Sequence, residues 1–135
     1  MFITRECDYA VRMIRAMAED PRQSVNEICE KESVTPPFAY KILKKLQEAG
    51  IVKGFRGVHG GYTLSASLDE ITLYDIYKAI NPNLFIIECL NPENRCERDG
   101  ADGKPCLVHR ELLEIQTEIG HLLRKKTIRQ ILEEA

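Results

Sequence analysis

The chain has 135 residues, which is enough for one domain with a core and a small appended element. Hydrophobic residues make up 44% and charged residues 30%, a composition that is typical of folded proteins and excludes a largely disordered chain. No apolar run approaches the roughly 20 residues of a membrane-spanning helix, and the first residues lack the pattern of a signal peptide. We therefore expect a cytoplasmic protein that has no membrane partner.

The net charge of −2 hides an uneven distribution. Residues 33–59 carry five basic side chains and one acidic side chain, so the local charge is +4 and the rest of the chain carries −6. Binding to a polyanion depends on local charge and not on the total. A basic segment on an acidic body therefore favours nucleic-acid binding.

Three helices are predicted before residue 50, over residues 4–21, 24–33 and 36–49. Apolar residues recur at helical spacing in the first, and a Ser24–Glu27 capping box begins the second. Two prolines begin the third helix and a glycine ends it. Two short helices separated by three or four residues have the spacing of a helix-turn-helix.

A β-hairpin and a fourth helix follow. Residues 51–55 and 62–64 have the pattern of strands, and the glycine-rich segment 56–61 joins them. A hairpin directly after a helix-turn-helix is a wing. A second capping box, Thr72 with Asp75, begins a short helix that a proline closes.

The remaining chain changes character twice. Residues 81–104 show little periodicity and contain two prolines, two glycines and two cysteines, and so long a loop needs a function or a crosslink. Beyond Pro105 an apolar seam at heptad spacing predicts a helix that packs against a partner helix. The seam consists of Val108, Leu112, Ile115, Ile119 and Leu122. Thr127 with Gln130 caps a last short helix.

The predicted fold class is mainly α with a small β-hairpin, and three segments divide the chain. Residues 1–80 form a winged helix-turn-helix DNA-binding domain, and residues 81–105 form a cysteine-containing sensor loop. Residues 106–135 form a long dimerisation helix and a short C-terminal helix.

Candidate DNA-binding residues lie on the third helix and in the wing. Lysines and a tyrosine of that helix lie off its apolar stripe, and Arg56 lies at the wing tip between glycines, which suits insertion into a narrow minor groove. A solvated basic helix face is the alternative interpretation. The candidates are Thr35, Tyr40, Lys41, Lys44, Lys45, Lys53, Arg56 and His59.

The five cysteines separate into two groups. Cys7 and Cys29 lie on apolar helical faces and are predicted to be core residues. Cys89, Cys96 and Cys106 lie in or beside the long loop, where thiolates are ligands that both iron–sulfur clusters and zinc prefer. Their spacing alone does not name the metal, and free thiols are the other interpretation.

Three motifs carry a resemblance to a known family: residues 7–12 (CDYAVR), 56–64 (RGVHGGYTL) and 72–76 (TLYDI). The chain resembles the bacterial winged-helix transcriptional regulators that include the iron–sulfur regulator IscR, the nitric-oxide sensor NsrR and the cysteine-metabolism regulator CymR. The resemblance covers nearly the whole length. It implies a homodimer that binds double-stranded DNA.

The resemblance also implies a cofactor and its ligands. Cys89, Cys96 and Cys106 match the cysteines that hold an iron–sulfur cluster, of 2Fe-2S or 4Fe-4S type, in the sensing members of the family. His109 or the partner subunit's Asp8 would complete the ligand set. Nine residues separate Cys96 from Cys106, more than is usual in the family.

The sequence thus predicts a dimeric DNA-binding regulator, such as a repressor, that senses iron–sulfur, nitric oxide or redox status through a cysteine-ligated cluster. One alternative is a cluster-free regulator that responds through thiols or a partner enzyme. Another is a winged-helix protein-interaction module that does not bind DNA. No nucleophile–base pair, phosphate loop or paired carboxylate stands out, so we do not expect an enzyme.

Overall fold

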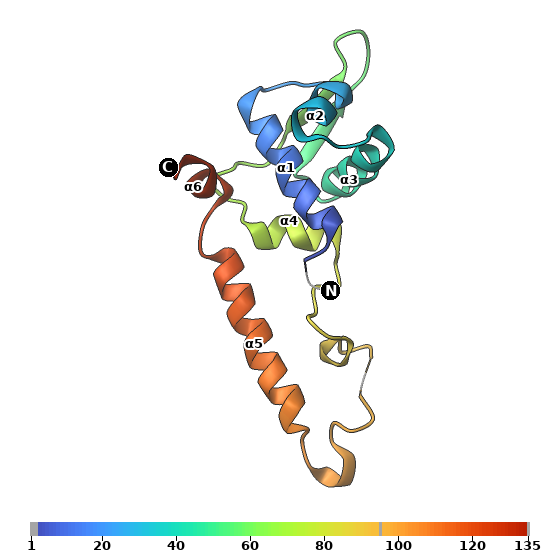
Figure 1. Cartoon of the computed structure of the whole chain (residues 1–135), viewed down its shortest axis with the longest axis vertical. Helices are drawn as coiled ribbons and strands as arrows, with labels where there is room; N and C mark the ends of the chain where they lie inside the picture. Colours follow the sequence, from blue (N-terminus) through green and yellow to red (C-terminus); the bar gives the residue numbers. More distant parts are fainter. Residues whose placement is uncertain (1–2, 95, 135) are drawn as a thin grey trace.

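The computed structural model describes residues 3–94 and 96–134, and it places a helical head with a small hairpin above a long helical arm (Figure 1). The elements in chain order are α1 (Arg5–Glu19), α2 (Val25–Glu32), α3 (Pro36–Glu48), β1 (Val52–Phe55), β2 (Gly61–Leu64), α4 (Leu73–Ile80), the 3-10 turns η1 (Glu88–Leu90) and η2 (Ala101–Gly103), α5 (Leu107–Arg124) and α6 (Ile128–Glu133). The mainly α fold class with one hairpin is confirmed.

Local chemistry explains where the helices begin and end. The Thr4 and Ser24 side chains accept hydrogen bonds from backbone N–H groups at the starts of α1 and α2. At Thr72 and Thr127 both halves of a capping box are formed, as the sequence predicts. Gly50 follows α3 with a φ of +78°, the left-handed conformation expected of a helix stop.

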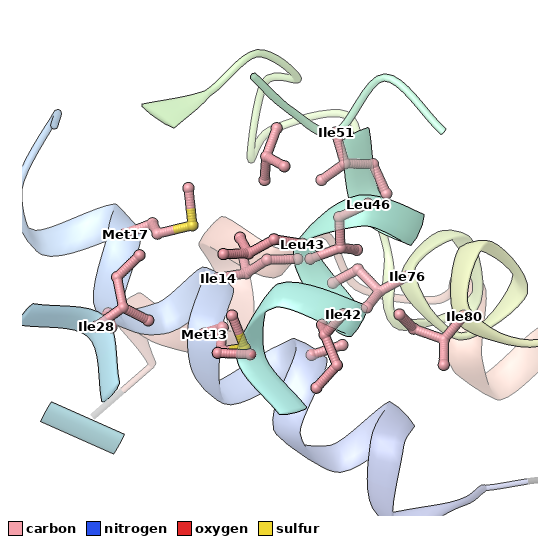
Figure 2. Close-up of a cluster of buried hydrophobic side chains, with 14 of the residues drawn as sticks. Met13, Ile14, Met17, Ile28, Ile42, Leu43, Leu46, Ile51, Ile76 and Ile80 are labelled. Carbon is pink, nitrogen blue, oxygen red and sulfur yellow. The ribbon is translucent and has the colours of Figure 1, made fainter. Parts of the chain in front are cut away.

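The core lies where α1, α3 and α4 meet (Figure 2). Met13 and Ile14 of α1 pack with Ile42 and Leu43 of α3, and all four side chains are fully buried. Cys7 and Cys29 are also buried, which confirms that they are core residues. Fully burying a side chain of this size stabilises a fold by about 1.5–3 kcal/mol, so this cluster holds the head together.

The wing is fixed to the turn between α1 and α2. β1 and β2 pair antiparallel, and Tyr62 exchanges two further backbone hydrogen bonds with Gln23, with N···O distances of 3.1 and 2.7 Å. The buried Gln23 amide donates to the carbonyl of Ala16 at 2.6 Å. A β-carbon at Gly61 would overlap the Gln23 carbonyl, so this close approach requires glycine. The wing therefore leaves the head at a fixed angle.

The arm leaves the head and returns to it. The segment after α4 runs down beside α5, and α5 leads back up to α6 (Figure 1). The Ile128 N–H donates to the carbonyl of Ile71 at 2.8 Å, and the Arg129 guanidinium pairs with Asp69 at 2.8 Å. The C-terminal end of α5 is thereby anchored to the head. None of the helices in the described ranges is long and apolar enough to cross a membrane.

Candidate nucleic-acid interface and sensor loop

Helix α3 presents a polar face to solvent. Its apolar residues are buried against α1, α2 and α4, whereas Tyr40, Lys41 and Lys44 are exposed. The start of the helix is unusual because Pro36 and Pro37 occupy its first two positions and supply no N–H groups. The Thr35 hydroxyl makes no capping hydrogen bond and is exposed, so it remains available to a ligand.

The wing carries the second half of the predicted surface. Lys53, Arg56 and His59 are all exposed. A hollow of about 320 Å³ lies between the wing and α3, and it is lined by residues that include Tyr40 of α3 and Gly57 of the wing loop. Helix α3 and the wing therefore border one concave surface.

Arg22 joins this surface, although the sequence analysis did not select it. Its guanidinium carbon lies 3.8 Å from the centroid of the Phe55 ring on β1, and the Lys53 Nζ lies 5.3 Å from the same centroid. This places Arg22 on the hairpin in space even though it belongs to the α1–α2 turn in sequence. No local pattern in the sequence links Arg22 to Phe55. The pairing of Gln23 with Tyr62 and the hydrogen bond from the Thr63 hydroxyl to the carbonyl of Pro21 bring them together.

Lys45, one of the predicted DNA contacts, makes contacts within its own chain. Its Nζ lies 2.9 Å from the Glu6 carboxylate and donates a hydrogen bond to the carbonyl of Ile80 at 3.2 Å. The contact with Glu6 is a charge contact and not a well-aligned hydrogen bond, since that oxygen has no hydrogen-bond partner among the described residues. Lys45 therefore links α3 to α1 and α4 and is turned from the exposed face.

The three loop cysteines are free thiols that are neither fully buried nor fully exposed. Cys89 lies in η1 and Cys106 immediately precedes α5. Asp99, which the sequence analysis did not select, organises the loop between Cys96 and Cys106. Its backbone N–H donates to the carbonyl of Cys96 and its carboxylate accepts from the N–H of Cys106, both at 3.1 Å.

His109 lies one turn into α5 and also faces Asp99, with 4.0 Å between its Nε2 and the carboxylate. Its Nδ1 is buried and has no hydrogen-bond partner within residues 3–94 and 96–134. Across those ranges no three histidine, cysteine or acidic side chains come together as a ligand set for a metal ion. Asp8 is half exposed on α1 and pairs with Arg12 at 3.1 Å.

The predicted seam on α5 is mostly open to solvent. Val108, Ile115 and Leu122 expose 66%, 42% and 67% of their surface. Leu112 is half-buried, and Ile119 differs from the others because it packs against the core of its own chain. A stripe of large apolar side chains on a helix is rarely left exposed to water, so the exposed part of this seam indicates a binding surface.

The helix-turn-helix, the wing fixed beside it and the long returning arm define a winged-helix regulator. A family model described as "Iron-dependent Transcriptional regulator", Rrf2, matches residues 3–134. The chain therefore belongs to the Rrf2 family and is a transcriptional regulator. Within the residues that the structure describes, no observation indicates catalysis.

Relatives of known name are distant but extend over the whole chain. The HTH-type transcriptional regulator NsrR of Shouchella clausii is 23% identical over 143 residues, which cover 98% of this chain and 96% of that protein. The crystal structure of oxidized CymR from Staphylococcus aureus superposes with a TM-score of 0.75 at 20% identity, covering 100% of this chain and 98% of the other. T. potens IscR gives a TM-score of 0.70 at 21% identity, with coverage of 98% and 87%. At these identities the two structures establish the fold alone.

Proposed function

We propose that this protein is a homodimeric regulator whose two winged-helix heads bind double-stranded DNA. The observation that carries the proposal is that exposed cations lie on α3 and on the wing, the two elements that border the hollow, and that Arg22 of the α1–α2 turn lies against Phe55 of the same hairpin. The rest of the chain is acidic, so this surface is where a polyanion would bind.

Different residues would contact the phosphates, the base edges and the minor groove of the DNA. Lys41 and Lys44 suit contacts to phosphates, which position a protein on the duplex. Thr35 and Tyr40 lie at the exposed part of α3 that would approach base edges in the major groove. Arg56 at the wing tip suits a narrow minor groove, where the negative potential is strongest.

The exposed apolar seam of α5 supports the dimer. A second copy of α5 would cover Val108, Ile115 and Leu122, and coiled-coil packing uses this heptad spacing. A twofold dimer places two heads on half-sites about 10–10.5 base pairs apart, or a multiple of that, so the operator would be pseudo-palindromic. Residues 1–80, 81–105 and 106–135 would then be the DNA-binding, sensing and dimerisation segments.

The cysteine loop is proposed to hold an iron–sulfur cluster of 2Fe-2S or 4Fe-4S type. The donor types fit the group, although no three of them come together among the described residues: Cys89, Cys96 and Cys106 are free thiols, and the buried Nδ1 of His109 has no hydrogen-bond partner in that part of the chain. Asp8 of a second subunit is the other candidate for the fourth position. When bound, a cluster would supply sensitivity to iron, oxygen or nitric oxide, and metal–thiolate bonds would order a loop that has little core of its own.

Fluorescence anisotropy with duplex DNA tests the first proposal. Lys44→Ala is expected to weaken binding to all sequences and to lower the slope of log K against log salt by about 1. Arg56→Ala is expected to weaken mainly sites with A·T-rich narrow grooves. Lys125→Ala, on an exposed lysine between α5 and α6, is the matched control and should bind as the wild type does. Equally low wild-type affinity for every duplex at low salt would contradict DNA binding and support a protein-interaction module.

Anaerobic reconstitution followed by absorption spectroscopy and iron and sulfide analysis tests the cluster. Each of the changes Cys89→Ala, Cys96→Ala and Cys106→Ala should abolish the thiolate-to-iron bands, whereas Cys29→Ala should retain them. His109→Ala and Asp8→Ala should be told apart because only the true ligand alters the spectrum or speeds cluster loss. Wild-type protein that retains DNA binding but holds neither iron nor sulfide would favour a cluster-free regulator responding through thiols or a partner enzyme.

A further inference from the structure

A small pocket lies between the head and the arm, away from both the DNA-binding surface and the cysteine loop. Its volume is about 270 Å³, and it is bordered by α4, by residues 82–85 and by the C-terminal half of α5. This is just below the usual range of ligand-binding pockets, so only a small molecule fits.

The pocket is cationic in an acidic part of the chain. Lys78 of α4 and Arg124 of α5 both line it, and no aspartate or glutamate does. Neither cation has a carboxylate within 4.0 Å among the described residues. His121 also lines the pocket, but it lies 3.9 Å from Glu118 and so is not an uncompensated charge.

One aromatic ring brings the two cations together. The Arg124 guanidinium carbon lies 3.6 Å from the centroid of the Tyr74 ring, and the Lys78 Nζ lies 5.8 Å from the same centroid. Two like charges gathered at one ring repel each other, and an anion between them would remove that repulsion. The ring also fixes the guanidinium plane, and a guanidinium presents a planar pair of donors that matches a carboxylate.

Gly120 makes the space for this arrangement. It is buried in the C-terminal half of α5, where glycine costs a helix about 1 kcal/mol relative to alanine. A β-carbon at this position would lie 3.3 Å from Nη1 of Arg124, which is tighter than an ordinary contact, so the end of that side chain would have to shift by a few tenths of an ångström. Glycine therefore lets Arg124 keep its place over the Tyr74 ring.

The other walls give the pocket a mixed character. Leu84 and Phe85 supply an apolar side, and Gln116 lies in place because its Oε1 accepts a hydrogen bond from the backbone of Ile86 at 2.9 Å. This fixed orientation leaves the Gln116 amide NH₂ as a further donor. An apolar wall opposite two cations suits an organic anion better than a bare inorganic one.

The pocket lies on a different side of α5 from the seam, so a second copy of α5 that covers the seam would leave the pocket open. Residues 117, 120 and 124 follow each other at one-turn spacing, and at 100° per residue they lie on roughly the opposite side of α5 from Val108, Ile115 and Leu122. Dimerisation through the seam would therefore leave a ligand free to enter.

We propose that this pocket is a binding site for a small organic carboxylate, held by Arg124 and Lys78 over the Tyr74 ring. The carboxylate would accept from the guanidinium and the ammonium, and its apolar part would lie against Leu84 and Phe85. The site does not involve the DNA-binding surface or the cluster ligands, so it can be tested without either.

The test is a titration of isotope-labelled protein, without DNA, at constant ionic strength and followed by amide chemical shifts. The probes are benzoate, inorganic phosphate and benzyl alcohol, which separate the carboxylate with an apolar part from an anion alone and from an apolar part alone. Benzoate is expected to give saturable shifts at the pocket residues and to bind more tightly than the other two. Arg124→Gln should weaken benzoate binding by about tenfold or more, and Gly120→Ala should weaken it less.

Lys125→Gln removes an adjacent charge that does not line the pocket and serves as the matched control, which should bind benzoate as the wild type does. Shifts that rise without saturation overturn the site. So does benzoate binding that Arg124→Gln leaves unchanged. Phosphate that binds as tightly as benzoate overturns the assignment to a carboxylate.

Discussion

The head and the arm of this molecule are built on different principles. Up to Ile80 the chain folds around a continuous apolar core, whereas in the described chain beyond Ile80 the buried hydrophobic side chains are Leu84, Leu90 and Ile128. The cysteine loop of the arm, residues 81–105, is held mainly by polar contacts such as those that Asp99 makes with the backbone of Cys96 and Cys106. The head holds most of the core, to which Leu84 and Ile128 also belong, and the arm carries an exposed seam, free thiols and one wall of a cationic pocket.

This division agrees with the task of a regulator. A rigid head keeps α3 and the wing in a fixed relation, which sequence recognition requires. A weakly packed arm responds to small changes in free energy, because few apolar contacts oppose its rearrangement. Since α4 and α6 join the arm to the head at two places, a ligand that orders the arm would, in the proposed dimer, bias the position of both heads on DNA.

The largest expected effect of a single change is in the core of the head. Leu43→Ala removes a fully buried side chain and should lower the free energy of unfolding by about 2–5 kcal/mol. Leu107→Ala, at a residue of the arm that is 72% exposed, is the matched control and should change it by less than about 0.5 kcal/mol. Urea unfolding followed by circular dichroism measures both, and similar losses would mean that the arm is as tightly packed as the head.

The cysteines should show the same contrast in their rates of alkylation. Burial raises the pKa of the Cys29 thiol, so this residue stays protonated and shielded at neutral pH. Cys89, Cys96 and Cys106 are more accessible and should react at least about a hundredfold faster in metal-free protein. Mass spectrometry after timed exposure to iodoacetamide gives the rates, and equal rates for all five thiols would show that the head opens as readily as the loop.

The seam should govern assembly through its exposed residues. Ile115→Lys combined with Leu122→Lys places two charges on the apolar stripe and should weaken dimerisation by about tenfold or more. Leu113→Lys is the control, because Leu113 is similarly exposed but lies on another side of α5. Sedimentation over a range of protein concentrations distinguishes them. A double variant that remains as dimeric as the wild type would exclude this surface as the interface.

Most of the head could be predicted from the sequence because its signals are local. The capping box at Thr72, the glycine after α3 and helical periodicity predicted its element boundaries to within a residue or two, and the capping box at Thr127 did the same for α6. The confirmed winged fold also follows from the motif in residues 56–64. These features depend on neighbours in the chain, which a sequence displays directly.

What the sequence did not reveal depends on contacts between distant segments. Arg22 reaches the wing through the pairing of its neighbour Gln23 with Tyr62, and Asp99 closes the cysteine loop across seven residues. Ile119 fits the heptad pattern but packs against the core of its own chain, whereas Leu122, three residues further on, remains exposed. Periodicity identifies an apolar face and does not say which partner covers it.

Lys45 gives the smallest and sharpest test of what a helix pattern leaves undecided. It is adjacent to Lys44 in sequence, yet it contacts Glu6 and the carbonyl of Ile80, whereas Lys44 is exposed. Lys45→Ala should therefore leave the salt dependence of DNA binding unchanged, in contrast to the decrease of about 1 in slope expected for Lys44→Ala.

The effect of Lys45→Ala on stability should be small. The change should lower the free energy of unfolding by no more than about 1 kcal/mol, because Lys45 and Glu6 are both partly open to solvent and screening weakens their contact. Glu6→Gln should reproduce the same small loss, and adding it to Lys45→Ala should cost little more, since either change alone already breaks the pair. A Lys45→Ala variant that instead lowers the slope as Lys44→Ala does would place Lys45 on the DNA and not against α1.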